Sequence, residues 1–239
     1  MKSVSRQSSE DSVGLMFDRI APVYDKLNHI LSFGMDFFWR RRLAHSVNKQ
    51  KQLQILDLAS GTGDLLISLL KRNHNIIGAA GLDISEEMLS ICRKKIAGYS
   101  FAGKVNFVCA DACSSGLSDN SFDLVTMGFG IRNTPDTFKT LTEIFRLLKP
   151  GGETLILEFS MPPNKALRIL YLLYLRYYVP FIGRLVSGDK NAYKYLNVSI
   201  EEFCKKEDFS SLMRKAGFEN ISSQPITFGV VRIYKGSKK

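Results

Sequence analysis

The 239-residue sequence predicts an α/β fold in which a mostly parallel sheet is covered by helices on both faces. Three observations support this prediction. Short apolar runs alternate with stretches of helical periodicity, as in repeated strand–helix units. The first apolar run, residues 54–58, ends at a glycine-rich turn, which is typical of a buried parallel strand. Near the C-terminus, two extended runs flank Phe228-Gly229 and predict an antiparallel pair.

A helical segment is predicted ahead of the first strand, over residues 15–48, because its apolar residues recur at helical steps. Pro22 is expected to break this segment, since proline lacks the backbone N–H, and Gly34 to interrupt it again. Residues 1–14 are polar and serine-rich, so we expect a disordered tail there. No apolar stretch follows that tail, which argues against a secretory signal.

The alternating region predicts five strands and three helices. The strands are expected at residues 54–58, 76–83, 105–110, 122–128 and 153–159, and the helices at 65–72, 85–97 and 137–148. Ser85 is the predicted N-cap of the second helix, three residues before Met88. The third helix is expected to stop at residues 149–152 (KPGG), where proline and glycine cannot continue it. A last helix, residues 209–216, and two strands, 221–227 and 230–234, complete a predicted sheet of seven strands.

Between residues 162 and 203 the alternation of strands and helices lapses. Residues 166–182 are dense in Leu and Tyr but contain Arg168 and Arg176. We expect a helical cap inserted into a single domain of residues 15–239, rather than a second domain.

The composition is that of a globular protein, with 45% hydrophobic and 23% charged residues. Lys and Arg number 33 against 23 Asp and Glu, and the net charge of +10 predicts attraction to nucleic acid or to an anionic membrane. Charge alone does not choose between them. The 4 cysteines form no C-x-x-C pair and only 3 histidines are present, so we expect no metal site and free thiols in a reducing cytoplasm. No apolar run approaches about 18 residues, so no transmembrane helix is expected.

The turn after the first strand has the features of a nucleotide site. Gly61 and Gly63 allow the backbone to approach a ligand closely. A dinucleotide fingerprint would carry a third glycine where this chain has Leu66, which argues against NAD. Asp57 instead places a carboxylate where it can meet an ammonium group. S-adenosylmethionine (SAM) has such a group at its methionine end, and NAD does not.

Two more acidic residues end the next two strands. Asp83 can accept hydrogen bonds from both ribose hydroxyls, and Asp111, beside Ala112, can accept one from an adenine amino group. Aspartates at strand ends often only cap turns, so each alone would more often be structural. Together, at the ends of three consecutive strands, Asp57, Asp83 and Asp111 predict a nucleotide-like ligand.

Several motifs resemble those of known methyltransferases. Residues 57–64 (DLASGTGD) and 149–152 (KPGG) are similar to class I SAM-dependent methyltransferases in general. More specific runs lie outside these motifs, at residues 17–25 (FDRIAPVYD), 31–34 (LSFG), 129–133 (FGIRN), 157–160 (LEFS), 193–196 (YKYL), 199–200 (SI) and 227–231 (TFGVV). These runs resemble the ubiquinone/menaquinone biosynthesis C-methyltransferases, the UbiE/MenG family, and the resemblance extends over about residues 15–236.

The resemblance implies a Rossmann-like class I SAM-methyltransferase fold with a helical N-terminal lid and a helical cap. It implies that Thr62, Asp83, Asp111 and Ala112 bind the cofactor SAM. Family members often carry Ser where this chain has Gly128, so only the backbone of Gly128 is expected to serve the cofactor. The implied reaction is methylation of a ring carbon of a polyprenylated quinol, from demethylmenaquinol to menaquinol or in ubiquinone biosynthesis.

Arg132 and Tyr24 are the expected catalytic residues. A quinol hydroxyl must lose or share its proton so that charge reaches the neighbouring ring carbon, which then attacks the methyl group in line. Arg132 follows the fourth strand and can stabilise the developing phenolate, although an Arg there can also simply pair with a carboxylate. Tyr24 and Asp25 lie in the N-terminal helical segment, which can fold over the site as a lid, although such a Tyr is more often core. His29 and His45 are candidate bases by chemistry alone.

The cap segment allows two interpretations. Its apolar residues recur at helical steps, which most often indicates core or a homodimer face. Aromatic side chains mixed with Arg168, Arg176 and Arg184 also suit a membrane interface, as does the run 37–42 (FFWRRR). We therefore expect a polyprenyl quinol substrate and peripheral contact with an anionic membrane at its inner, cytoplasmic face.

Three other functions stay open at this point. A methyltransferase acting on RNA would account for the positive charge, but the chain lacks the Asn/Asp-Pro-Pro-aromatic run of base-methylating enzymes, so no nucleic-acid partner is expected. A non-catalytic quinone or lipid carrier would not need intact acidic and glycine positions. An NAD-dependent reductase is disfavoured by Leu66 and Asp57. The acceptor can be a naphthoquinol or a benzoquinol.

Overall fold

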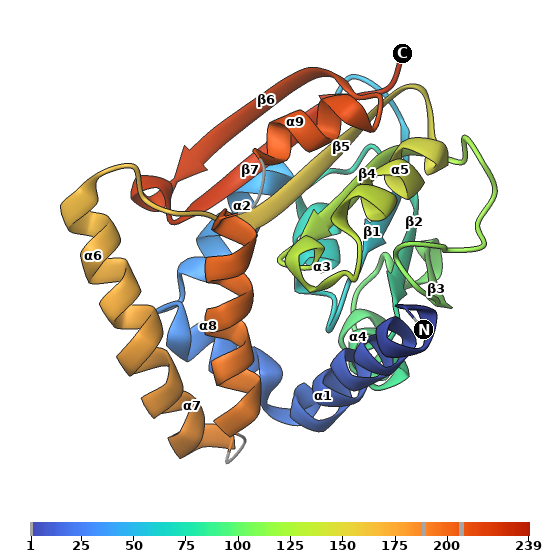
Figure 1. Cartoon of the computed structure of the whole chain (residues 1–239). Coiled ribbons are helices and arrows are strands. Elements are labelled where there is room, and N and C mark those ends of the chain that lie inside the picture. The colour runs from blue at the N-terminus through green and yellow to red at the C-terminus, as the bar shows by residue number, and fades with distance from the viewer. Residues whose placement is uncertain (1, 188–189, 206–207) are drawn as a thin grey trace.

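The computed structural model describes residues 2–187, 190–205 and 208–239, and within them a sheet of seven strands lies at the centre (Figure 1). The strands are β1 Leu53–Leu58, β2 Ile76–Asp83, β3 Val105–Cys109, β4 Phe122–Gly128, β5 Leu148–Phe159, β6 Glu219–Ile226 and β7 Val231–Ser237. Their order is β3-β2-β1-β4-β5-β7-β6, and β7 runs antiparallel to the other six strands. The predicted α/β class, mostly parallel seven-stranded sheet and C-terminal antiparallel pair are confirmed.

Strand β5 begins at Leu148 rather than at residue 153 as predicted. The backbone N–H of Gly151 donates to the Lys238 oxygen at 2.8 Å, and the N–H of Lys238 donates to the Gly152 oxygen at 2.9 Å. Proline and glycine thus end the preceding helix as expected, but hydrogen bonds to the C-terminal segment make their turn part of strand β5.

Helices cover both faces of the sheet, and each face has its own apolar core. The helices packed on the sheet are α2 Met35–His45, α3 Asp64–Arg72, α4 Glu86–Ala97, α5 Thr137–Leu147 and α9 Phe209–Lys215. Leu43, Leu69 and Ile96 place α2, α3 and α4 in one buried cluster with the sheet. Ile144 and Met213 place α5 and α9 in a second cluster on the opposite face. Two cores are the consequence of parallel strands that are buried on both sides.

Two predicted helix signals act where the sequence places them. Ser85 Oγ accepts a hydrogen bond from the Met88 N–H at 3.1 Å and so caps α4. Gly34, with φ of 75°, precedes α2 in the left-handed conformation and turns the chain out of α1.

Helix α1, Lys2–Leu31, is longer and less interrupted than predicted. Of the tail expected to be disordered, residues 1–14, the described part from Lys2 onward belongs to α1, and Pro22 lies inside the helix instead of breaking it. Ile20 and Leu27, on either side of the proline, are buried against the cap, and this packing holds the helix together. Extending a helix that is already formed is also far easier than starting one.

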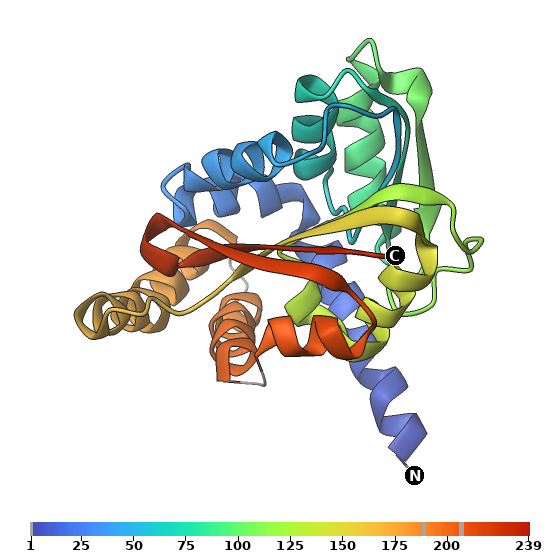
Figure 2. The ribbon, with the colours of Figure 1, turned by 90° about the horizontal axis from the view of Figure 1, so that it is seen from above.

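The cap consists of α6 Lys165–Leu173, a π-helical turn Tyr174–Tyr178, α7 Val179–Ser187 and α8 Lys190–Lys205. Tyr171, Leu175 and Ile200 pack with Leu27 of α1 in a third buried cluster. Seen from above, α6 and α7 stand out from the edge of the sheet (Figure 2). Residues 188–189 of the predicted cap lie outside the described part of the chain.

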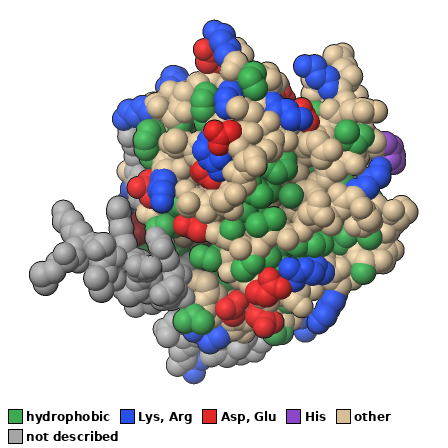
Figure 3. All heavy atoms as spheres, turned by 90° about the vertical axis from the view of Figure 1, so that its right-hand side faces the viewer, with side chains coloured by type: hydrophobic (Ala, Val, Ile, Leu, Met, Phe, Trp, Pro, Cys, Tyr) green, Lys and Arg blue, Asp and Glu red, His purple; other side chains and the backbone are tan. Residues whose placement is uncertain are grey.

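No helix within residues 2–187, 190–205 and 208–239 combines the length and the apolar character needed to cross a membrane. On the face opposite the cap, Lys and Arg side chains are interspersed with Asp and Glu (Figure 3). The surplus of positive charge is therefore not gathered into one basic patch on that face.

Candidate active site

The chain between β1 and α3 turns in a loop of left-handed residues. Ala59, Gly61 and Gly63 have φ of 52°, 54° and 84°, a conformation that glycine adopts at little cost. A Cβ at Gly63 would lie 2.3 Å from Cys92 Sγ, so only glycine fits there. A Cβ at Gly61 would meet nothing within 4 Å, because that position borders a cavity. The close approach of a ligand to the backbone is therefore available at Gly61.

Asp57, near the carboxyl end of β1, is only 1% exposed. Its Oδ1 accepts a hydrogen bond from Thr126 Oγ1 at 2.6 Å, whereas Oδ2 has no partner in the described part of the chain. Burial raises the pKa of Asp57 to about 7, against the opposing effects of Thr126 and Arg40. A buried carboxylate with one open oxygen offers the acceptor that an ammonium group needs.

Asp83 ends β2 and holds the glycine loop in place. Its carboxylate accepts hydrogen bonds from the Gly61 N–H at 2.7 Å and from the Ser85 N–H at 3.0 Å. Burial raises the pKa of Asp83, and these backbone hydrogen bonds act against that effect. Each carboxylate oxygen can accept a further bond, so the side chain is still available to ligand hydroxyls.

Asp111, just after β3, lies in the same cavity as Asp83, a space of about 320 Å³. Asp111 Oδ1 accepts a hydrogen bond from the Cys113 N–H at 2.8 Å. Ala112 and Met88 give the cavity an apolar wall. The structure thus brings three predicted cofactor residues to one place.

A second cavity, of about 280 Å³, adjoins the first between the sheet, α1, α2 and the cap. Asp57 lines this second cavity. The two cavities share six lining residues, namely Tyr24, Ala59, Gly61, Gly128, Phe129 and Arg132. Both predicted catalytic residues therefore stand at the wall where the two spaces meet.

Thr62, a predicted cofactor residue, is engaged by helix α1. Its Oγ1 donates a hydrogen bond to Asp25 Oδ1 at 2.6 Å. Asp25 Oδ2 lies 2.6 Å from Lys95 Nζ, which in turn lies 2.6 Å from Asp64 Oδ1. One chain of polar contacts therefore ties α1 to the glycine loop, to α4 and to the start of α3.

Arg132 is both an ion-pair partner and a potential ligand group. Its side chain is 6% exposed, and Nη1 donates to Glu158 Oε1 at 2.9 Å and to the backbone oxygen of Phe129. Its Nε has no partner in the described part of the chain. Glu158 is fully buried at 0% exposure. The pairing that the sequence left as an alternative is present, and one N–H remains open beside the cavities.

Tyr24 approaches the shared wall from α1. Burial raises the pKa of Tyr24, while the positive charges of Arg132 and Arg40 lower it. The net effect is upward, so the hydroxyl keeps its proton at neutral pH. The structure thus brings Tyr24 and Arg132 close enough to interact.

Gly128 ends β4 at the same wall. A Cβ there would lie 2.9 Å from Leu65 Cδ2, which is closer than ordinary contact allows. The serine that relatives often carry at this position would not fit unless Leu65 moved.

The run 37–42 divides between core and surface, so it is not the single interfacial surface expected from the sequence. Trp39 is 5% exposed and donates from Nε1 to Thr227 Oγ1 at 2.7 Å. Its ring lies 5.8 Å from that of Phe129 and 6.1 Å from that of Phe159, and the three line the second cavity. Neighbouring residues of a helix point in different directions, so the six residues of this run cannot all lie on one surface. The exposed members of the run are Phe37, Phe38, Arg41 and Arg42.

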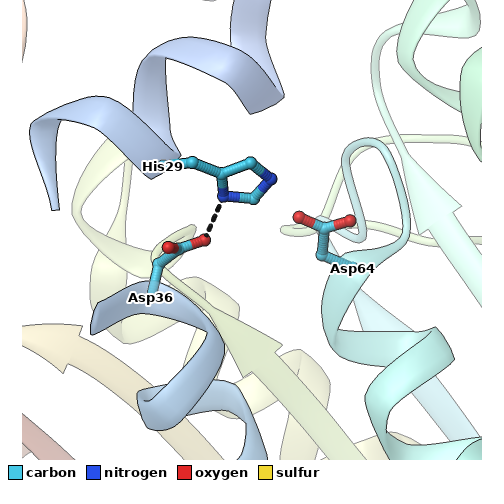
Figure 4. A group of neighbouring side chains, drawn as sticks. All are labelled: His29, Asp36 and Asp64. Atoms are coloured by element: carbon cyan, nitrogen blue, oxygen red, sulfur yellow. Dashed lines mark hydrogen bonds and ion pairs between the residues drawn. The ribbon is translucent and has the colours of Figure 1, made fainter. Parts of the chain in front are cut away.

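His29, Asp36 and Asp64 form a polar cluster beside the second cavity (Figure 4). His29 Nδ1 lies 2.7 Å from Asp36 Oδ2. Burial would raise the pKa of Asp36, but Arg40, which bonds to it, makes the net shift downward. Arg40 also lies 3.8 Å from Asp64 Oδ2, so its guanidinium supplies the positive charge that a metal ion would otherwise bring. The other candidate base, His45, is exposed and lines neither cavity.

This strand order, with Asp57 near the end of β1 and Leu66 where a dinucleotide site has its third glycine, is that of a class I SAM-dependent methyltransferase. Among solved structures, the chain resembles phosphoethanolamine N-methyltransferase 2 of Haemonchus contortus, solved with SAM, at a TM-score of 0.60 and 18% identity. The match covers 86% of this chain and 52% of that one, and at this identity the likeness is one of fold.

The model of the ubiE/COQ5 methyltransferase family matches residues 5–238, and the chain belongs to this family. Ubiquinone/menaquinone biosynthesis C-methyltransferase UbiE of Geotalea daltonii is 40% identical over 93% of this chain and 94% of its own length. Demethylmenaquinone methyltransferase of Thermus thermophilus is 41% identical over 93% of this chain and 100% of its own length. The family resemblance seen in the sequence is confirmed.

Proposed function

We propose that this protein methylates a ring carbon of a polyprenylated quinol with SAM as the methyl donor, converting demethylmenaquinol to menaquinol or acting on a ubiquinone precursor. The observation that carries the proposal is the unpaired Nε–H of Arg132, a residue that lines the same aromatic cavity as Asp57. The names of the two relatives support the same substrate class.

The residues present fit SAM, which supplies an electrophilic methyl group when bound. The open Oδ2 of Asp57 would hold its ammonium group, and Asp83 and Asp111 its ribose and adenine. Gly61 and Gly128 would contribute only backbone, which suits the open space beside Gly61.

Arg132 would bind the substrate as its quinolate and stabilise the negative charge on that oxygen. Glu158 orients the guanidinium, because it holds Nη1 and leaves Nε open. Charge on that oxygen spreads to the neighbouring ring carbon, which is the nucleophile in C-methylation. Tyr24 keeps its proton, so its hydroxyl can donate a second hydrogen bond to the same oxygen.

The aromatic wall keeps the reacting groups dry. The rings of Phe129 and Phe159 lie 4.7 Å apart, and Trp39 closes the group. In such surroundings the attraction between Arg132 and a quinolate oxygen is stronger than in water, and water is kept from the methyl donor.

We also propose that the outer face of the cap rests on an anionic membrane at the cytoplasmic side. Ile169, Leu173, Tyr177 and Phe181 recur every four residues along the cap and are 48% to 71% exposed. Arg184 is exposed close to this stripe, and the chain as a whole carries +10. The inner face of the same helices lines the second cavity, so a polyprenyl tail would pass from bilayer to ring site without crossing water.

Vesicle sedimentation tests the membrane proposal. We expect binding to phosphatidylglycerol vesicles at low salt, weaker binding to phosphatidylcholine vesicles, and loss of binding in Tyr177→Glu and Phe181→Glu. Phe138→Glu, on α5 rather than on the stripe and 44% exposed before substitution, is the matched control. Absence of binding, or burial of the stripe in a homodimer that does not bind vesicles, contradicts the proposal.

Incubation with methyl-labelled SAM and short-chain quinols tests the reaction. We expect label on the ring carbon of demethylmenaquinol, and a parallel benzoquinol arm decides whether both ring types are accepted. If the protein binds SAM but leaves both quinols unlabelled, the substrate assignment is wrong.

A further inference from the structure

Buried polar atoms without hydrogen-bond partners concentrate at the second cavity. In the described part of the chain seven such side-chain atoms occur, and five belong to residues that line this cavity, namely Asp57, Ser60, Asp64, Arg132 and Tyr171. Leaving a buried polar group unpaired costs stability, so a cluster of them marks the place where a ligand completes the bonding.

The five atoms belong to two chemical sets. Oxygens of Asp57, Ser60 and Asp64 lie on or beside the glycine loop, where they suit the ammonium end of the cofactor. Arg132 Nε and the Tyr171 hydroxyl carry protons that they can donate, and one comes from the sheet side and the other from the cap. The mechanism proposed above uses Arg132 Nε but not the Tyr171 hydroxyl.

Tyr171 is held firmly for such a role. It lies on α6, is 9% exposed, and its ring stacks at 6.2 Å on that of Tyr174. Burial raises the pKa of Tyr171 well above its ordinary value, so its hydroxyl stays protonated and cannot act as a base near neutral pH. Arg132 and Tyr171 line the same cavity, so both donors are available to one ligand bound there.

We infer that the Tyr171 hydroxyl donates a hydrogen bond to the second oxygen of the quinol ring, opposite the oxygen bound by Arg132. The inference rests on the proposed function. A 1,4-quinol carries its oxygens on opposite sides of the ring, and a single contact leaves the ring free to rotate about it. Two contacts, one from each side of the cavity, fix which ring carbon faces the methyl donor.

A substitution that removes only the hydroxyl tests this role. Tyr171→Phe is compared with Tyr99→Phe, a control at a residue that lines neither cavity and whose hydroxyl accepts a hydrogen bond from Lys71 Nζ at 2.9 Å. Each is assayed with a short-chain demethylmenaquinol and with the matching 1-naphthol, which lacks the second oxygen. We expect Tyr171→Phe to lower kcat/KM for the quinol about tenfold, as for one lost hydrogen bond, and to leave the naphthol unchanged. The comparison of the two losses cancels the different intrinsic reactivity of the rings.

Two further measurements separate binding from folding. The affinity for SAM should not change in Tyr171→Phe, and the melting temperature of the ligand-free protein should stay the same or rise, because an unpaired buried hydroxyl has been removed. Equal losses with both substrates, or a fall in melting temperature, overturn the inference and leave the proposed function intact. A wild-type protein that methylates no quinol overturns both.

Discussion

One oxygen of the buried Asp57 carboxylate, Oδ1, accepts a hydrogen bond from Thr126 Oγ1 at 2.6 Å, while Oδ2 has no partner in the described part of the chain. The pair comes from neighbouring strands β1 and β4, where Asp57 and Thr126 stand in register. Half of the carboxylate is thus fixed by the fold, and the other half is left for a ligand. Burial raises the pKa of Asp57 to about 7, and the hydrogen bond from Thr126 offsets only part of this effect.

The ligand-free protein should lose stability as pH rises from about 4 to about 7. Because the folded pKa of Asp57, about 7, exceeds its ordinary 3.8, the folded state keeps a proton that the unfolded state has lost over this range. The stabilisation is complete below the lower pKa and is lost as pH passes the upper one. Melting temperatures of wild type and Asp57→Asn, measured across this range, test the prediction. If the melting temperatures of the two proteins change in parallel with pH, Asp57 makes no pH-dependent contribution to stability.

The affinity for SAM should also depend on the ionisation of Asp57, but it should rise with pH where the stability of the ligand-free protein falls. We expect binding to tighten as pH rises through about 7 and Asp57 ionises, then to weaken above about 8 as the α-amino group of SAM loses its proton. Asp57→Asn should bind about 10- to 100-fold more weakly, since a charge-assisted bond is lost, and should not show the rise through pH 7. Calorimetric titration with SAM at several pH values measures both effects.

Gly61→Ala and Gly63→Ala should fail in different ways. Both residues have positive φ, which costs a non-glycine residue about 1–2 kcal/mol. At Gly61 the new Cβ enters open space, so we expect a folded protein with weakened SAM binding. At Gly63 it would lie 2.3 Å from Cys92 Sγ, so we expect a further loss of about 1–3 kcal/mol in unfolding free energy.

Urea denaturation of the two glycine variants measures this difference. The double variant Gly63→Ala/Cys92→Ala is the control, because it should be more stable than the sum of the single effects predicts. Equal stability of Gly61→Ala and Gly63→Ala would show that crowding by Cys92 has no energetic weight.

Arg132→Gln should be unstable for a reason separate from catalysis. It leaves Glu158, 0% exposed, without its 2.9 Å partner, and breaking a buried pair costs about 3–5 kcal/mol. Adding Glu158→Gln should restore most of the stability, since no charge then remains buried. The double variant should nevertheless stay at least about 100-fold less active with quinol, because the group that stabilises the oxygen is missing. A double variant that regained both stability and activity would limit Arg132 to a structural role.

Gly128→Ser should destabilise the protein by about 1–3 kcal/mol, because the new Cβ crowds Leu65 Cδ2 at 2.9 Å. Leu65→Val removes the crowding atom and should make the serine tolerable. Unfolding free energies of the two single variants and the double variant give the coupling, which is expected to be favourable. Additive effects would mean that Leu65 moves aside at no cost.

Asp25→Asn should loosen α1 over the site. Asp25 bonds to Thr62 at 2.6 Å and pairs with Lys95 at 2.6 Å, so two of the contacts that hold the helix down are weakened. These groups are partly exposed, so we expect only a few-fold rise in the SAM dissociation rate, with faster amide exchange in α1. Glu86→Gln breaks an exposed pair with Arg93 on α4 and is the control. Unchanged exchange in α1 would rule out the tether.

Much of the fold could be predicted because its signals are local. The apolar runs of β2 and β4 and the Ser85 cap of α4 depend on residues a few positions apart, and the structure has them where the patterns are. The proposed cofactor positions Asp57, Asp83 and Asp111 could also be predicted from the sequence, since the carboxyl ends of parallel strands share one edge of the sheet.

Other features depend on partners far away in the sequence. Nothing near Pro22 indicates that the helix continues through it, because the burial that holds it comes from the cap. The aromatic and basic run 37–42 predicts a membrane-facing surface that includes Trp39, yet the Trp39 side chain points inward and donates a hydrogen bond to Thr227. The cap segment that contains Tyr171 could be assigned to core, homodimer face or membrane interface, but the sequence could not show that the Tyr171 hydroxyl lacks a partner, because that is a property of the packed cavity.

The sequence by itself determined the class of fold, the cofactor loop and the family, because these depend on short-range patterns and on motifs. Only the tertiary structure decided that Arg132 is held by Glu158, that Thr62 is held by Asp25, and that one oxygen of Asp57 is left open. Whether a buried polar group has a hydrogen-bond partner depends on which distant segments pack against it, and local sequence patterns do not show this.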